Sequence, residues 1–185
     1  MHRRHWHVIA DVLRDRPHSV GAEVGVFRGI FAKQLLNMLP DIAKYYCIDP
    51  WEHYDEYLLS IVPSSMERKI KPPQAFNVFK RNTKAFQDKV IVLRKMSQDA
   101  LIDIPDESLD FVFLDGNHTY EHAIVDIPNW SKKVKVGGII SGHDYHDNKR
   151  GRRIKPFGVK QAVRELVSDY RVEVNTWYTE KKASK

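Results

Sequence analysis

The 185-residue chain contains one cysteine, Cys47, so it cannot form an internal disulfide. A single thiol inside a predicted strand is typical of proteins in a reducing cytoplasm. No stretch approaches the roughly 18 consecutive apolar residues of a membrane span. The basic residues 1–6 also lack the apolar core of a secretory signal. These absences favour a cytoplasmic globular protein without a membrane partner.

The sequence also has no RNA-recognition motif and no zinc-ligand pair, although its formal net charge is +6. Its basic residues are dispersed, with local clusters at 132–133, 149–153 and 181–182. A solvated basic surface explains this distribution better than a nucleic-acid site. Nucleic acid therefore stays open only as a less favoured partner.

Apolar, β-branched stretches alternate with helical periodicity along most of the chain. This alternation predicts an α/β fold, Rossmann-like and doubly wound, with helices on both faces of a mostly parallel sheet. We expect six or seven strands, the last antiparallel, in a single domain over residues 1–185. The strands are predicted at 20–26, 44–49, 89–93, 109–115, 139–141, 170–174 and 176–179, with a turn at 134–138. The helices are predicted within 1–17, from 30 onward, and at 74–86, 97–101, 120–130 and 158–167.

Residues 51–73 are apolar and aromatic but are interrupted by prolines. A connection of this length in a compact domain is often a lid. The segment therefore predicts either a substrate lid or a satellite helix that covers the edge of the sheet.

The first predicted strand runs into two glycines, Gly25 and Gly29, and then into a helix. In doubly wound folds this turn binds the ligand. Dinucleotide-binding proteins have G-x-G-x-x-G there, whose amides hold a pyrophosphate. Here the spacing is G-x-x-x-G, with Glu23 just before it, and Asp49 ends the next strand, where an acid can bind both ribose hydroxyls. One acid near a cation and one near a ribose describe S-adenosylmethionine better than a nicotinamide dinucleotide.

Four motifs occur in order: E-V-G-V-F-R-G, I-D-P-W, F-L-D-G-N-H-T-Y-E and G-G-I-I-S-G-H-D-Y. Together they resemble the class I S-adenosylmethionine-dependent methyltransferases, over about residues 20–163. The most similar branch is the small one whose fourth strand ends in D-G-x-H-x-Y and whose fifth ends in H-D-Y. The resemblance implies O-methylation of a small hydroxylated acceptor. The cofactor-binding residues expected from it are Glu23, Gly25, Phe27, Arg28, Gly29, Asp49, Trp51, Ser97, Gln98 and Asp115.

Within this set, Glu23 and Gly25 would face the methionyl part of the cofactor and Asp49 the ribose. The turn after strand three lies against the adenine in related enzymes, which assigns Ser97 and Gln98 to the base. Three residues keep a structural alternative. Trp51 could shield the adenosine or pack in the core, Arg28 could pair with the methionine carboxylate or point to solvent, and Ser97 could cap the short helix that follows.

We expect the catalytic groups to be Asp115, His118, His143 and Asp144, since all lie at predicted strand ends. In one route, Asp115 and Asp144 hold a divalent ion that lowers the pKa of the acceptor hydroxyl. In the other, His118 or His143 is a metal-free general base. Metal-dependent catechol-type relatives have an acid where His143 stands, so His143 is a further candidate ligand and manganese or zinc suits the site better than magnesium.

These residues could also have purely structural roles. Asp115 could cap its own turn, and His118 could cap the helix that starts near Thr119. His146 and the N-terminal histidines are expected at the surface.

Two rival functions also stay open: a nucleic-acid methyltransferase that uses the basic loop 149–153, and a cofactor-binding protein without catalysis. The sequence is also compatible with a homo-oligomer.

Overall fold

Alternating strands and helices build the protein, and the computed structural model describes residues 2–52, 72–146 and 158–183. The strands are β1 (Val20–Val24), β2 (Lys44–Ile48), β3 (Val90–Leu93), β4 (Leu109–Leu114), β5 (Val134–Gly142), β6 (Arg171–Glu173) and β7 (Thr176–Glu180). The α-helices are α1 (His5–Leu13), α2 (Ile30–Met38), α4 (Pro72–Thr83), α5 (Ser97–Ala100), α6 (Tyr120–Lys133) and α7 (Val159–Leu166). Two short 3-10 helices, η2 (Lys84–Phe86) and η3 (Leu101–Asp103), extend α4 and α5.

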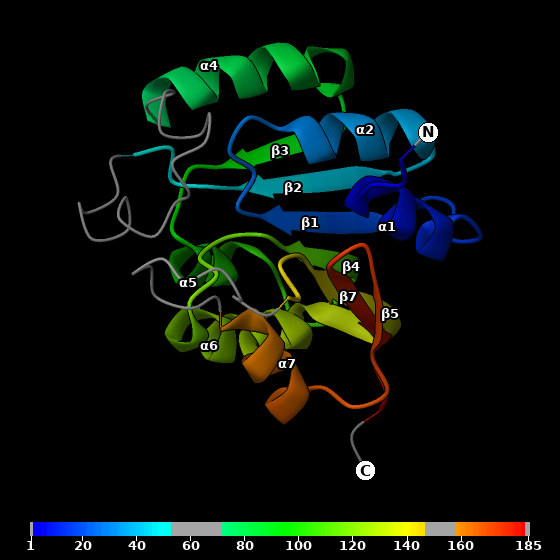
Figure 1. Cartoon of the computed structure of the whole chain (residues 1–185). Coiled ribbons are helices and arrows are strands. Elements are labelled where there is room, and N and C mark those ends of the chain that lie inside the picture. The colour runs from blue at the N-terminus through cyan, green and yellow to red at the C-terminus, as the bar shows by residue number, and fades with distance from the viewer. Residues whose placement is uncertain (1, 53–71, 147–157, 184–185) are drawn as a thin grey trace.

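The seven described strands form one sheet in the order β3-β2-β1-β4-β5-β7-β6 (Figure 1). β1 pairs in parallel with β2 and β4, and the parallel pairing continues to β3 on one side and β5 on the other. β7 runs antiparallel to both β5 and β6. The predicted α/β fold with a mostly parallel sheet and an antiparallel last strand is therefore confirmed, with seven strands.

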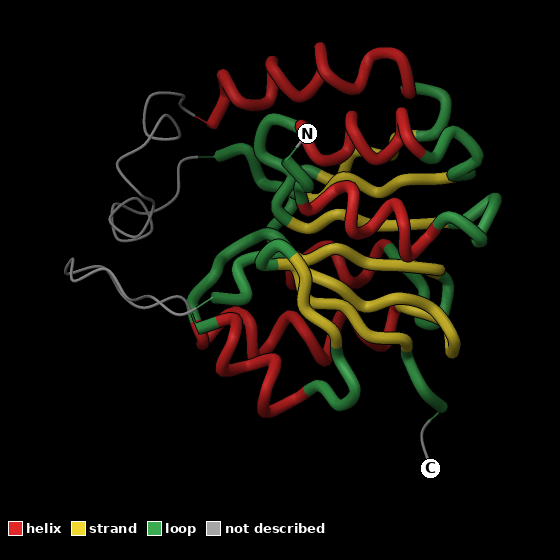
Figure 2. The backbone as a smooth tube through the Cα atoms, turned by 45° about the vertical axis from the view of Figure 1, so that its right-hand side comes forward, coloured by secondary structure: helices red, strands yellow, loops and turns green. Residues whose placement is uncertain are grey.

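Helices cover both faces of this sheet (Figures 1 and 2). On one face, α1, α2 and α4 pack over side chains such as Tyr45, Phe111 and Phe113. On the other, α5, α6 and α7 pack over Ala22 and Val112. Successive side chains of a strand point to opposite faces, which is why neighbouring residues of β4 enter different clusters. Strands buried on both faces explain the continuous apolar runs in the sequence.

The fifth strand starts earlier than predicted. The turn expected at 134–138 is part of β5, so that prediction is wrong. The register between β4 and β5 shifts between Leu109 and Phe111, and Gly137 has a φ of 80°. Glycine adopts such a φ without strain, so it allows an irregularity inside the strand rather than ending it.

The last two predicted strands, β6 and β7, are present and form a hairpin. Val174 and Asn175 join β6 to β7, with φ angles of 51° and 58°. Two successive positive φ angles are typical of a type I′ turn, whose twist matches that of the strands it joins.

Two predicted segments fall largely outside the described residues. Of the lid or satellite helix at 51–73, residues 53–71 lie outside, and so does the whole basic loop 149–153. Within the described ranges, no helix has both the length and the apolar character needed to cross a bilayer.

Candidate active site

The carboxyl ends of the parallel strands bring the predicted acidic residues to one edge of the sheet. Glu23 lies near the end of β1, and its backbone pairs with Cys47 of β2 and Phe113 of β4. Asp49 and Asp115 follow the last residues of β2 and β4 directly. Ligands of open α/β sheets bind beyond this edge.

The glycine turn after β1 lies directly against the end of β4. Gly25 has a φ of 91°, and its N–H donates to the Ile48 carbonyl. A Cβ at Gly25 would lie 2.3 Å from the carbonyl oxygen of Asp115. Gly29 has a φ of 67° at the N-cap of α2, where a Cβ would lie 2.7 Å from Phe79. Both glycines are therefore required by the backbone geometry.

Asp49 holds the glycine turn to the end of β2. One carboxylate oxygen accepts the Phe27 N–H at 2.9 Å, and the other accepts the Trp51 N–H at 2.8 Å. The Trp51 indole N–H donates to the Phe27 carbonyl, and its ring packs against Phe76 and Phe79. Trp51 is buried in this packing.

Glu23 is enclosed beneath this turn and is 1% exposed. The Tyr45 hydroxyl donates to its carboxylate at 2.9 Å. Burial raises the pKa of Glu23 well above its usual range, the Tyr45 hydrogen bond opposes the rise, and Asp115 and Asp49 add to it. An ionised Glu23 is costly here unless positive charge lies nearby.

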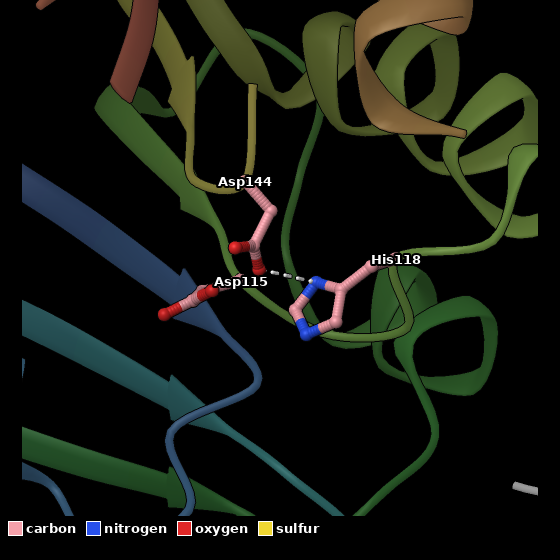
Figure 3. Close-up of side chains that lie close together, drawn as sticks. All are labelled: Asp115, His118 and Asp144. Carbon is pink, nitrogen blue, oxygen red and sulfur yellow. Dashed lines mark ion pairs between the residues drawn. The ribbon is translucent and has the colours of Figure 1, made fainter. Parts of the chain in front are cut away.

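Asp115, His118 and Asp144 form a cluster of possible metal ligands at the ends of β4 and β5 (Figure 3). One ligand atom from each lies within 4.8 Å of the others. The His118 Nδ1 is 3.0 Å from Asp144 Oδ2. Thr119, rather than His118, is the N-cap of α6, so the capping role considered for His118 is wrong.

His143 and His146 also contact Asp144. The Nδ1 of His143 lies 3.3 Å from Asp144 Oδ1 and 3.7 Å from Asp115 Oδ1. The Nε2 of His146, whose side chain is partly exposed, lies 3.3 Å from the same Asp144 oxygen. All four predicted catalytic residues are therefore brought together, with one additional histidine.

The charges in this cluster stabilise one another. Burial alone would raise the pKa of Asp144, but hydrogen bonds from His118 and His143 hold it well below its usual range. Burial would likewise lower the pKa of both histidines, but Asp144 and Asp115 raise it. The site therefore combines a persistent carboxylate with imidazoles that readily take up a proton.

No sequence motif singled out His5, the first residue of α1. Its ring centroid lies 4.6 Å from that of His143, and the ring stacks on Phe31 and Phe113. Burial, with His143 nearby, lowers the pKa of His5 to about 4. The prediction of a surface histidine is wrong here. The spacing of four residues from His5 to Ile9 could have indicated an inward-facing position.

Ser97 and Gln98, predicted to contact the adenine, both bind Asp126 of α6. The Ser97 hydroxyl donates to Asp126 Oδ1 at 2.7 Å, and the Gln98 amide donates to the same oxygen at 2.5 Å. Met96 is the N-cap of α5, so the capping role considered for Ser97 is wrong. Asp126 is 8% exposed, and no sequence motif singled it out.

The Arg28 side chain is half-buried, so it is neither fully exposed to solvent nor fully enclosed. Its guanidinium carbon is 5.3 Å from the centroid of the Phe27 ring. The Nε atom is buried and has no hydrogen-bond partner within the described ranges. A buried, unpaired guanidinium N–H favours an anionic group nearby.

Comparisons with known proteins agree with this geometry. A family model described as a methyltransferase domain matches residues 22–145. The O-methyltransferase NovP superposes with a TM-score of 0.64 at 18% identity, over 96% of this chain and 78% of NovP. A SAM-dependent methyltransferase from Aquifex aeolicus superposes with a TM-score of 0.58 at 14% identity, over 95% of this chain and 87% of that one.

Two curated relatives are similar over shorter stretches. An uncharacterized protein of Sinorhizobium fredii is 35% identical over 77 residues, 42% of this chain and 8% of the relative. One of Acanthamoeba polyphaga mimivirus is 32% identical over 69 residues, 37% of this chain and 29% of the relative. The match thus spans less than a third of either relative's length. The family match, which covers more than half of the chain, shows that it belongs to the methyltransferase-domain family.

Proposed function

We propose that the enzyme transfers a methyl group to a hydroxyl oxygen of a small acceptor. The observation that carries this proposal is the Asp115–His118–Asp144 cluster beside the glycine turn. An acceptor hydroxyl must lose its proton during transfer, and the imidazole of this cluster, held beside two carboxylates, is suited to take that proton up. The shared fold with NovP, an O-methyltransferase, is consistent with the assignment.

The residues at the sheet edge fit S-adenosylmethionine by their chemistry. Asp49 and Asp115 make the mouth of β2 and β4 acidic, which suits a sulfonium cation and disfavours a diphosphate. Glu23 is buried beneath the glycine turn, where a cation nearby would favour its ionised form. When bound, the cofactor supplies the methyl group in an in-line displacement that leaves a neutral thioether. We assign Glu23 and Gly25 to its methionyl part and Asp49 to its ribose.

The remaining cofactor contacts follow from the same placement. Arg28 would pair with the methionine carboxylate through its guanidinium, whose Nε is buried. Ser97 and Gln98, which follow β3, would contact the adenine. Phe27 and Trp51 would shape the wall of the pocket, because both are fixed by hydrogen bonds to Asp49.

Proton transfer would use the His118–Asp144 pair. The carboxylate of Asp144 remains ionised because His118 and His143 donate to it, and it orients the His118 ring. His118 would take the acceptor proton, and the resulting imidazolium would be stabilised by Asp144 and Asp115. The role of the aspartate here is orientation and charge stabilisation rather than proton uptake.

The same cluster fits a divalent cation. Two carboxylates and one imidazole form a mixed oxygen and nitrogen donor set, which manganese and zinc accept more readily than magnesium. Asp115, His118 and Asp144 would be the ligands, with His143 beside them. A bound cation would supply Lewis acidity that lowers the pKa of the acceptor hydroxyl.

Calorimetric titration with S-adenosylmethionine and with NAD, followed by product detection over phenols and sugars, tests this function. We expect the first ligand alone to bind, and S-adenosylhomocysteine to appear together with an O-methyl product. Absence of turnover with every hydroxylated acceptor, or methylation of a nitrogen or carbon atom, would contradict the proposal.

A further inference from the structure

Three residues of α6 fix the orientation of the two side chains assigned to the base. Asp126, Asn129 and Trp130 lie three and four positions apart and therefore share one face of the helix. Each contacts Ser97 or Gln98 at the start of α5. Asp126 accepts from both residues, and no other α6 side chain in the described part of the chain does so.

The two hydrogen bonds of the Ser97 hydroxyl to α6 leave it able to accept a further hydrogen bond but not to donate one. A hydroxyl has one proton and two lone pairs. The proton goes to Asp126, an acceptor, at 2.7 Å. The Trp130 indole N–H donates to the same hydroxyl oxygen at 2.8 Å and occupies one lone pair. Ser97 is half-buried, so its remaining lone pair can accept a hydrogen bond from a ligand, but the hydroxyl cannot donate one.

Gln98 is fixed in a similar way. Its amide nitrogen donates to Asp126, and its carbonyl accepts the Asn129 amide N–H at 3.2 Å. The two partners prevent the amide group from exchanging its oxygen and nitrogen positions. Gln98 is exposed, so the outer side of this fixed amide is accessible to a ligand.

The location suits a base because β3 is the neighbour of β2 in the sheet. Asp49 at the end of β2 is the residue assigned to the ribose. A nucleoside that extends from β1 across β2 therefore brings its base to the end of β3, where α5 starts.

We propose that Asp126 is a positioning residue that makes this pocket specific for adenine by keeping the Ser97 hydroxyl an acceptor. This inference rests on the proposed assignment of Ser97 to the base. The exocyclic amine of adenine donates a hydrogen bond and is therefore complementary to Ser97. Hypoxanthine has a carbonyl oxygen at that position, so two acceptors would face each other.

Calorimetry with S-adenosylhomocysteine and with S-inosylhomocysteine tests this role, since the two ligands differ only in the base. The wild-type protein should bind the adenosyl compound about tenfold more tightly, the ratio expected for one mismatched hydrogen bond. Asp126→Leu has a similar shape but no acceptor. It frees the hydroxyl to rotate, and the ratio should fall below about threefold.

Trp130→Phe is the matched control, because it also removes one partner of Ser97 from a buried position on α6 but leaves Asp126 in place. It should keep the wild-type ratio. If Asp126→Leu does not fold, Ser97→Ala replaces it as the test variant. It should lower the ratio of the two ligand affinities to the same extent. A residue that only stabilised the fold would change both affinities together and leave their ratio unchanged.

The possible failures are distinguishable. If neither ligand binds the wild-type protein, the proposed function is overturned along with this inference. If both ligands bind equally well, or if folded Asp126→Leu keeps the wild-type ratio, the cofactor assignment survives and the role of Asp126 is overturned.

Discussion

The imidazole of His118 and the carboxylate of Asp144 are 3.0 Å apart, although the two residues follow different strands of the sheet. His118 lies in the loop after β4, and Asp144 lies in the segment after β5. Because β4 and β5 are parallel neighbours, their carboxyl ends deliver both side chains to the same point. Asp144 has a φ of 56°, a left-handed conformation that aspartate adopts more readily than most residues.

Replacing Gly25 with alanine should destabilise the fold and distort the candidate site. In Gly25→Ala, the new Cβ would lie 2.3 Å from the Asp115 carbonyl oxygen. We expect a loss of about 3 kcal/mol or more in the free energy of unfolding, measured with urea. Gly137→Ala is the matched control, since Gly137 also has a positive φ but its Cβ would meet nothing within 4 Å. It should cost only roughly 1–2 kcal/mol, and equal losses in the two variants would refute the close-approach argument.

Glu23 should make stability depend on pH. Its pKa is raised in the folded state, so the folded protein binds a proton more tightly than the unfolded chain. The stability from this group is fully present below the ordinary value of 4.5 and is lost as the pH rises towards the folded pKa. Glu23→Gln keeps an acceptor for the Tyr45 hydroxyl and removes the ionisation. Its melting temperature near neutral pH should exceed that of the wild type, and the difference should vanish below about pH 4.

The same variant should reveal the function of Glu23. S-adenosylmethionine carries a positive sulfonium, whereas S-adenosylhomocysteine is neutral. Loss of a nearby negative charge should therefore weaken binding of the first ligand by about tenfold and leave the second almost unchanged. Equal effects on both ligands in calorimetry would show that Glu23 does not sense the charge of the cofactor.

His5 should support the reaction centre through His143. In His5→Ala, the ring that stacks on Phe31 and Phe113 and touches His143 is lost. We expect kcat to fall by about tenfold, because a displaced His143 no longer orients Asp144. His5→Phe should retain most of the activity, since it keeps the aromatic stack. His2→Ala, at an exposed position, is the control, and a similar loss of activity there would point to a general effect of the N-terminal segment.

A divalent cation should bind at the Asp115–His118–Asp144 cluster. Calorimetry should detect manganese or zinc with higher affinity than magnesium, since one ligand is an imidazole. Asp115→Asn should weaken this binding by at least about tenfold, while Asp106→Asn, at an exposed acid paired with Lys133, should leave it unchanged. Full methyltransferase activity in the presence of a chelator would leave a histidine base as the mechanism.

Much of the fold could be predicted because its signals are local. Apolar runs mark strands such as β3 and β4. Gly25 and Gly29 mark the first turn, where positive φ angles exclude most side chains. The parallel order then implies that Asp115 and Asp144 meet at one edge. The start of β5 could not be predicted because a glycine in the sequence indicates a turn as well as it indicates an irregular strand. In the structure, Gly137 lies within β5, whose register with β4 shifts.

The residues that were missed depend on contacts between distant elements. His5 reaches His143 only because α1 packs on α2 and the sheet, and no motif links residues so far apart. Asp126 has no motif of its own, and its role comes from two side chains on α5. Trp51 was assigned to the cofactor or the core with equal weight, and only the position of α4 shows where its ring packs.

The proposal that methyl transfer occurs at the His118–Asp144 pair is tested most directly by Asp144→Asn in a single-turnover assay. The substitution removes the charge that orients His118 but leaves the proposed cofactor-binding residues at the ends of β1, β2 and β3 in place. We expect the variant to bind S-adenosylmethionine with wild-type affinity and to form S-adenosylhomocysteine at least about 100-fold more slowly. Turnover at the wild-type rate, with cofactor bound, would contradict the account.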